Sequence, residues 1–446
     1  MRLRVPGAER AEELLAPVLT ATIVAFTFGS SAFRPTLYLG RLFRWPLFLV
    51  LAFLALRWAW ARTPRPRFPA SLAAAAGAFV FLAIVSFGWT VRPVLSLRAF
   101  ALGIMFATAA ALAVGSAGRP EATRRLLGAI LRAAVAVAAI GVLLLPVPHG
   151  HAVQHATRAY PARFQGVGEN PNTVPLLLAV AMPIAVWFLL RARTGRERLL
   201  LGGAIALFVA HIAAGSSRGA LEGSLVGTGL LLLLVLPNWS RRAIGVAVAG
   251  VVAAAAFGAM TIPNAKSGPP KVPPAGTRDA QQVRPLEAEI GLPYGPRKRL
   301  HRSLLGSSGR GQAWRGAVNQ AVDRPLLGYG FGAEASVFTD RFYYFYSSTP
   351  ENTVLGAFLQ LGAIGLALVV ALVLTVLGLA ARALRRPPPG EQEAVAVASV
   401  IFLAGIVMAV TQTYLLAVGN LATVAVWICG FLAASRAVSI PQGEQG

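Results

Sequence analysis

The sequence is poor in cysteine, lysine and acidic residues. Its one cysteine, Cys429, excludes a disulfide within the chain and a metal site built from cysteines. Lysine occurs only at positions 266, 271 and 298, and the chain has 17 acidic residues against 41 lysines and arginines. Charged residues make up 13% of the 446 positions, whereas a soluble domain has about 25%. These shortages exclude an ordinary soluble globular protein.

Hydrophobic residues make up 56% of the chain, and its mean hydropathy is +0.63. Apolar runs of membrane-spanning length recur without the alternation of barrel strands, so the sequence predicts an all-α polytopic membrane protein. The first run follows a stretch that is too polar for a cleavable signal, and we expect it to be retained. We place twelve spans near residues 12–32, 43–61, 70–90, 96–117, 125–147, 172–191, 197–214, 218–236, 242–262, 351–381, 394–414 and 416–437.

Arginines gather on alternate connections between the predicted spans. Because cytoplasmic loops are enriched in arginine and lysine, both termini are predicted to be cytoplasmic. The net charge of +24 suits anionic lipid headgroups, whereas arginines scattered between spans do not suit nucleic-acid binding. The arginine-rich segments are "MRLRVPGAER", "RTPRPRFP", "GRPEATRR", "RARTGRER", "NWSRR" and "ARALRRPPPG".

Two outward connections are longer than a turn, and the second is much longer than the first. The first lies at about 147–172. The second is a loop at 263–349, which separates an N-terminal membrane bundle of nine helices at 1–262 from three C-terminal membrane helices at 350–446. The loop begins with a Pro- and Gly-rich part that we expect to be extended, and "GRGQAWRGAVNQAV" then predicts an amphipathic helix. A connection this long is usually functional or disordered, and the helix favours function.

Polar residues at the outer ends of spans are candidate site residues, because charge near lipid is costly. The turn "GSSRG" after the seventh span contains Ser217 and Arg218, and Glu222 follows one helical turn later. Arg218 either holds a phosphate, pairs with Glu222 or reaches the headgroups as an anchor. His211 either faces the same cavity or is an ordinary core histidine.

Three further groups lie on the same predicted side. "RFQGVGENPN" contains Arg163, which is placed to meet an anion. Arg310 and Trp314 are four residues apart and share one face of the loop helix, although this helix could also be a simple interfacial helix with a belt tryptophan. Glu351 stands directly before the tenth span and is followed by Asn352.

Two clusters receive a weaker interpretation. The aromatic run "RFYYFYSS" at 341–348 fits a membrane interface and would also stack on sugars. "PHGHAVQH" contains three histidines, but no carboxylate is placed to complete a site, so no metal is predicted. Several arginines and one carboxylate on the outer side suit a lipid diphosphate and a general base, rather than a cytoplasmic nucleotide-sugar enzyme.

Four motifs, taken in order, resemble the O-antigen ligase/polymerase family of bacterial membrane glycosyltransferases. "RFQGVGENPN" resembles its Arg-x-x-Gly…Asn-Pro-Asn loop, and "GSSRGALEGSLVG" resembles its Ser-Arg-Gly turn. "GRGQAWRGAVNQAVDRPLLGYGFG" resembles its Arg-x3-Trp helix with Pro-Leu-x-Gly-x-Gly, and "ENTVLGAFLQLGAIG" resembles its His-Asn-x-x-Leu…Gly-x-x-Gly segment. The likeness covers roughly 160–380, and the first five spans match by topology alone. It implies a GT-C-like bundle with a partly helical periplasmic loop between helices nine and ten.

The resemblance also implies a function. The chain would be a metal-independent transferase without a cofactor, in the bacterial inner membrane, with a periplasmic active site. Its donor would be a glycan on undecaprenyl diphosphate, its acceptor a hydroxyl of a glycan or lipid, and a chain-length regulator would be a possible partner. By the resemblance, Arg218, Arg310 and Arg163 hold the diphosphate, Glu351 is the catalytic base, and Asn352, Trp314, Ser217, Glu222 and His211 support them.

Glu351 departs from the family pattern, because ligases usually carry histidine at this position. Either group can accept the proton of an acceptor hydroxyl, so ligase and polymerase both stay open. The rival interpretations are a lipid-linked glycan flippase and a peptidoglycan polymerase of the shape, elongation, division and sporulation type. The absence of a clear internal repeat and the clustering of polar residues on one side favour the enzyme over the flippase. The Ser-Arg-Gly and Arg-x3-Trp motifs favour it over the peptidoglycan polymerase.

Overall fold

The chain is described by a computed structural model over residues 8–63, 66–147, 151–154, 162–261, 310–341 and 349–438. The first half of the bundle comprises α1 Ala8–Phe28, α2 Arg34–Trp60, α3 Ala70–Val85, η1 Ser86–Gly88, α4 Pro93–Ser96, α5 Arg98–Ser116, α6 Pro120–Leu143 and α7 Thr173–Arg191. The remainder comprises α8 Gly195–Ala214, α9 Arg218–Val235, α10 Trp239–Thr261, α12 Arg310–Ala321, α13 Glu334–Arg341, α14 Thr353–Arg385, α15 Gln392–Ala409 and α16 Leu421–Ser435.

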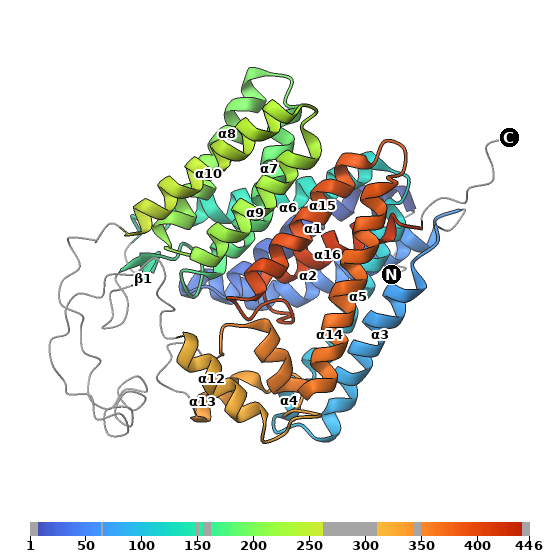
Figure 1. Ribbon diagram of the computed structural model, residues 1–446, viewed down its shortest axis with the longest axis vertical. Coiled ribbons are helices and arrows are strands. Elements are labelled where there is room, and N and C mark those ends of the chain that lie inside the picture. The colour runs from blue at the N-terminus through green and yellow to red at the C-terminus, as the bar shows by residue number, and fades with distance from the viewer. Residues whose placement is uncertain are drawn as a thin grey trace, which may run out of the picture.

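The helices pack as one bundle in which both ends of the chain take part. Figure 1 shows α7 to α10 side by side along one flank, and α3 beside α14 along another. α15 packs against α9 and α7, and α16 packs against α5. α12, α13 and α4 gather at one end of the α3–α14 pair (Figure 1). A two-stranded antiparallel pair, β1 Val153–Gln154 and β2 Arg163–Phe164, lies in the second outer loop.

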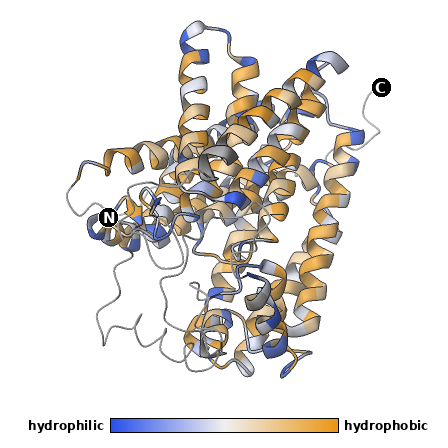
Figure 2. Ribbon diagram, turned by 60° about the vertical axis from the view of Figure 1, so that its left-hand side comes forward, coloured by the Kyte–Doolittle hydropathy of each residue, from blue (hydrophilic) through white to orange (hydrophobic). Residues whose placement is uncertain are grey.

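The predicted all-α membrane class is confirmed. Within the described residues, ten helices are long and apolar enough to cross a membrane. Figure 2 shows these helices hydrophobic along most of their length, with hydrophilic residues at their ends. The predicted twelfth span began too early, because residues 410–420 form turns and Asn420 caps α16 by accepting from the Ala422 N–H at 2.9 Å. α16 is therefore a shorter apolar helix.

The predicted loop helix over 309–322 is α12. Several other predicted features cannot be compared with the structure. The Pro- and Gly-rich part of the long loop, residues 342–348 of the aromatic run, His149 and His155 all lie outside the described residues.

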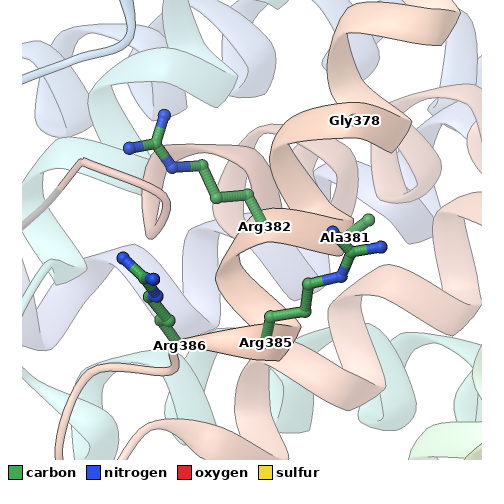
Figure 3. A pocket seen from close by; sticks show the side chains of 5 residues that line it. All are labelled: Gly378, Ala381, Arg382, Arg385 and Arg386. Atoms are coloured by element: carbon green, nitrogen blue, oxygen red, sulfur yellow. The ribbon is translucent and has the colours of Figure 1, made fainter.

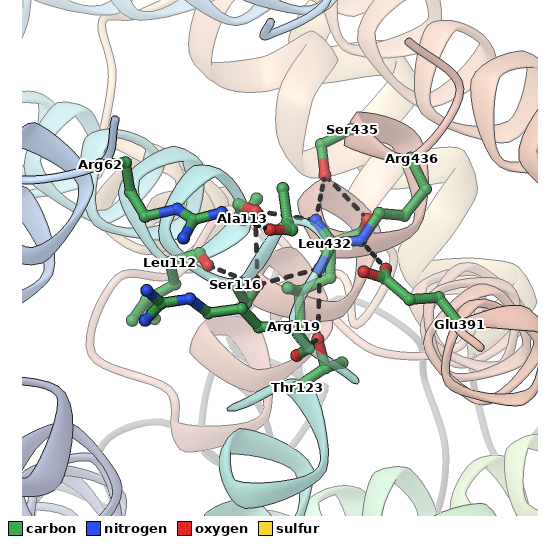
Figure 4. Close-up of polar contacts among 11 residues, drawn as sticks. Arg62, Leu112, Ala113, Ser116, Arg119, Thr123, Glu391, Leu432, Ser435 and Arg436 are labelled. Atoms are coloured by element: carbon green, nitrogen blue, oxygen red, sulfur yellow. Dashed lines mark hydrogen bonds and ion pairs between the residues drawn. The ribbon is translucent and has the colours of Figure 1, made fainter. Parts of the chain in front are cut away.

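A buried ion pair holds one end of the bundle together. Arg436, directly after α16, pairs with Glu391 at the start of α15, and both side chains are 2% exposed or less. The Arg436 guanidinium also donates to the Ala113 carbonyl oxygen at 2.8 Å, to Ser116 Oγ at 3.0 Å and to Thr123 Oγ1 at 3.2 Å (Figure 4). These contacts join the ends of α5, α6, α15 and α16, all of which were predicted to face the cytoplasm.

At the opposite end, α14 is interrupted and a glycine-rich loop fills the interruption. Gly362 has φ 63° and ψ −162°, which is not helical. The Gly330 N–H donates to the Gln360 carbonyl oxygen at 2.8 Å, and the Ala363 N–H donates to the Pro325 carbonyl oxygen at 2.7 Å. A Cβ at Gly362 would lie 2.3 Å from the loop backbone, so only glycine allows this approach. The loop thus satisfies backbone groups that the break in α14 leaves unpaired.

The same loop is also fastened to the connection between α3 and α5. Trp89 Nε1 donates to the Leu327 carbonyl oxygen at 3.0 Å. The Phe331 N–H donates to Ser86 Oγ, and Ser96 Oγ donates to the Phe331 carbonyl oxygen, each at 2.9 Å. The loop between α12 and α13 is therefore anchored by hydrogen bonds to two different parts of the bundle.

Candidate functional site

Arg310 of α12 and Glu351, just before α14, form a direct ion pair. Nη2 and Nε of Arg310 donate to one carboxylate oxygen, Glu351 Oε2, at 2.8 and 3.1 Å. The two side chains are 18% and 22% exposed, so the pair is shielded but can still be reached. Among the described residues, no hydrogen bond is made to the other oxygen, Oε1. The carboxylate therefore keeps one oxygen that can accept a proton.

Glu351 is held in a strained backbone conformation. Its φ is 49°, in the left-handed region, which costs a non-glycine residue about 1–2 kcal/mol. Trp314 Nε1 donates to the Pro350 carbonyl oxygen at 2.9 Å, immediately before Glu351. Immediately after it, Asn352 caps α14 through its side chain, and its N–H donates to Thr413 Oγ1 at 2.8 Å. Such strain persists where neighbouring contacts impose it, which is common at functional sites.

The Ser-Arg-Gly turn lies near this pair. Arg218 begins α9, and its guanidinium is close enough to interact electrostatically with Arg310 and Glu222. A Cβ at Gly219 would be 2.5 Å from Thr411 Oγ1, so the start of α9 lies against the segment that also holds Asn352. Ser217 is buried, does not cap α9, and has no hydrogen-bond partner for Oγ among the described residues.

Arg163 lies in the outer loop that covers this turn, and His211 lies in the last turn of α8 beneath that loop. Arg163 is buried in the strand pair, where Nη2 donates to Gln154 Oε1 at 3.0 Å. The Phe164 ring packs on His211 at a centroid distance of 4.4 Å, and a Cβ at Gly166 would be 2.7 Å from His211 Nε2. Neither imidazole nitrogen has a hydrogen-bond partner among the described residues. His211 is therefore enclosed and not hydrogen-bonded to Glu351.

A groove of about 540 Å³ opens between α12 and the start of α14. This volume lies within the range of small-ligand sites, about 300–1,000 Å³. Its lining combines apolar side chains with an indole, two amides and a guanidinium, which together can pack on and hydrogen-bond a sugar. These polar and aromatic lining residues are Trp314, Arg315, Asn319 and Asn352.

Sequence reasoning missed one acidic residue that is linked to Asn352 through Thr413. Glu334 begins α13 and is buried, and its Oε2 accepts from Gln360 Nε2 at 3.0 Å. Burial raises the pKa of Glu334 to about 8, although hydrogen bonds from Thr413 and Gln360 oppose the rise. Because Thr413 also accepts from the Asn352 N–H, it links Glu334 to the residue that follows Glu351. In the sequence, Glu334 resembled an ordinary acid at a helix N-terminus.

Comparison with known families gives one match. Residues 203–370 match the family model described as O-antigen ligase, and this range includes Arg218, Arg310, Glu351 and the α12–α14 groove. A comparison with curated proteins found no match. The family match supports the resemblance over residues 203–370, where the chain is similar to the O-antigen ligase family model.

Proposed function

We propose that this protein transfers a glycan from undecaprenyl diphosphate to an acceptor hydroxyl at the periplasmic face of the bacterial inner membrane. The observation that carries the proposal is the Arg310–Glu351 pair, which places a carboxylate with a free oxygen beside cationic groups. The residues of this site come from α9, α12 and α14, at the end of the bundle opposite the buried Arg436 cluster.

In the proposed reaction, Glu351 Oε1 accepts the proton of the acceptor hydroxyl as its oxygen attacks the anomeric carbon. The new carbon–oxygen bond forms as the bond to the diphosphate breaks, and the electron pair leaves with the diphosphate. General-base catalysis of this kind contributes roughly 10²–10⁴-fold in rate. The proton ends on the carboxylate, and the next turnover requires its release to water.

Arginines would stabilise the departing diphosphate. Arg310 uses two of its five N–H donors on Glu351, and the other three are available for phosphate oxygens. Arg218 adds a second guanidinium to the same electrostatic environment. Positive charge placed in advance where negative charge develops lowers the barrier without a metal ion or cofactor. Arg163 is a third candidate contact, provided that the donor reaches the strand pair.

The groove beside Trp314 would hold the acceptor or the first donor sugar. Its amides and indole match a ligand with many hydroxyl groups better than they match an acyl chain. The same geometry would serve a growing lipid-linked glycan, as in a polymerase, or a lipid A–core acceptor, as in a ligase. A chain-length regulator would be a partner only in the polymerase case.

The test is glycan transfer by the purified protein in vesicles, with a defined undecaprenyl-diphosphate oligosaccharide as donor. Either a second donor molecule or lipid A–core is supplied as the acceptor, and the product identifies polymerase or ligase activity. Glu222→Gln is the matched control for Glu351→Gln, because both acids are near arginines of the site. Loss of transfer in Glu222→Gln with full transfer in Glu351→Gln would reassign the base.

Replacing the carboxylate by imidazole sharpens the same test. An ordinary histidine is already protonated below about pH 6.5 and can then no longer act as a base. An ordinary carboxylate becomes protonated only roughly two pH units lower. Transfer by Glu351→His should therefore fall at a higher pH on the acid side than transfer by the wild type. Identical acid limbs for the two proteins would argue against Glu351 as the base.

A further inference from the structure

The end of α14 away from the candidate site carries three arginines around a single cavity. The cavity measures about 540 Å³ and is lined by Gly378, Ala381, Arg382, Arg385 and Arg386 (Figure 3). Figure 3 shows the three arginine side chains spread around the last turn of the helix. None of the ion pairs found among the described residues includes these arginines. Their charge is therefore available to a ligand.

The cavity continues an exposed stripe along α14. Val370, Leu374, Gly378 and Ala381 are exposed at helical spacing, and Arg382 and Arg385 extend the same face. Val370 is 44% exposed and Leu374 is 61% exposed, so this face is not covered by another described helix. The stripe changes from large apolar side chains to small ones and then to guanidiniums. That order matches the order of acyl chain, glycerol backbone and headgroup in a phospholipid.

The small residues create the space that such a ligand needs. A Cβ at Gly378 would meet no atom within 4 Å, so the surface above the arginines is open. Arginines that only fixed membrane orientation would not need an indentation beside them. Guanidiniums bind phosphate oxygens with two parallel hydrogen bonds, and basic pockets at helix ends are known headgroup sites.

We propose that this arginine cavity binds the phosphate of an anionic phospholipid in the leaflet opposite the candidate glycan site, with an acyl chain along Gly378 and Leu374. The proposal does not depend on the transferase function. The same phosphate chemistry would also attract free inorganic phosphate, and the experiment must separate the two ligands.

The experiment measures phospholipid retained by the purified full-length protein after detergent exchange, with phosphatidylglycerol and phosphatidylcholine supplied together. Wild type should retain phosphatidylglycerol in preference. In the combined variant Arg382→Gln, Arg385→Gln, Arg386→Gln, the ratio of retained phosphatidylglycerol to phosphatidylcholine should fall about tenfold or more. The reason is that each arginine near an anionic lipid surface adds electrostatic attraction. The matched control is Arg193→Gln, Arg196→Gln, Arg198→Gln, at the α7–α8 connection and in the first turn of α8, which should change retention less than twofold.

A second variant tests the arginine cavity without changing the charge of the protein. Gly378→Leu fits the open surface and suits a helix, so the protein should fold, yet it fills the space for the acyl chain. Retention of phosphatidylglycerol should fall severalfold. Unchanged retention in the triple variant or in Gly378→Leu would overturn the site. Displacement of the lipid by an equal concentration of inorganic phosphate would also overturn it in favour of a soluble anion.

Discussion

Two acid–arginine pairs lie at opposite ends of this bundle, and they differ in burial and in surroundings. Glu391 and Arg436 are almost fully enclosed, and the guanidinium is also bound by a carbonyl and by hydroxyls of other helices. Glu351 and Arg310 are about one-fifth exposed and border a groove. A carboxylate and a guanidinium therefore have different roles in the two pairs. An enclosed pair joins helices, whereas a pair with an accessible oxygen can take part in proton transfer.

The largest expected difference between the two pairs is in activity. Glu351→Gln should reduce the rate of glycan transfer by roughly 10²–10⁴-fold, because an amide cannot accept the acceptor proton. Donor binding and the unfolding temperature should change little, since the amide can still accept a hydrogen bond from Arg310. Transfer in vesicles and thermal unfolding of the same preparation provide both measurements. Full transfer by this variant would place Glu351 with Glu391 among the structural acids.

The enclosed pair should show the opposite response. Glu391→Gln leaves the Arg436 charge buried without a counter-charge, and breaking a buried pair in this way costs about 3–5 kcal/mol. We expect a clear drop in the unfolding temperature and a lower yield of folded protein. Transfer per folded molecule should remain near wild type, measured after size exclusion. A loss of transfer with unchanged stability would contradict the division between the two ends.

A smaller effect is expected when only the geometry of the exposed pair changes. Arg310→Lys keeps the charge but loses the planar fork through which two nitrogens reach Glu351 Oε2. Affinity for a non-hydrolysable undecaprenyl diphosphate analogue should fall about tenfold, which is about 1.4 kcal/mol. Arg92→Lys, on an exposed outer connection, is the control and should bind normally. Equal binding by both variants would make Arg310 a simple point charge or an anchor.

The last expected effect is on the pH dependence of stability, and it concerns the buried carboxyl of Glu334. Burial raises the pKa of Glu334 from 4.5 to about 8. The folded protein therefore holds this proton more tightly than the unfolded chain does, and stability declines as pH rises between these values. The decline is at most about 1.4 kcal/mol per pH unit. Glu334→Gln should flatten it, as measured by unfolding temperatures at pH 5, 7 and 9. An unchanged slope would show that another group causes the decline.

Sequence patterns predicted much of this architecture because the constraint of the membrane is strong and local. Apolar runs predicted the long helices, and the four-residue spacing of Arg310 and Trp314 predicted that they share one face of the loop helix. In the structure these two residues contact Glu351 and Pro350, a pairing that the spacing did not predict. The role of Glu334 in its surroundings could not be predicted in this way. Its burial depends on Gln360 and Thr413, which are distant in sequence and meet only through the crossing of the loop with α14.

The start of α16 and the buried Glu391–Arg436 ion pair were not predicted, for a related reason. Residues 410–420 are apolar enough to continue a span, but hydrogen bonds to neighbouring segments favour turns there. Arg436 resembled one more cytoplasmic arginine after a span. Its enclosure arises from the approach of α5 and α6, which hydropathy cannot indicate. Tertiary contacts therefore decided what local composition left open.

The crossing at Gly362 has a consequence for the geometry of the candidate site before a ligand binds. Backbone hydrogen bonds join the loop after α12 to α14, in addition to the ion pair between Arg310 and Glu351. The entropic cost of bringing Arg310 to Glu351 is therefore met during folding, and the free energy of substrate binding need not offset it. A donor of the proposed kind would therefore meet a site whose two charged groups are already in contact. The two glycines at 330 and 362 thus contribute to the preorganisation of the candidate site, although neither bears a functional group.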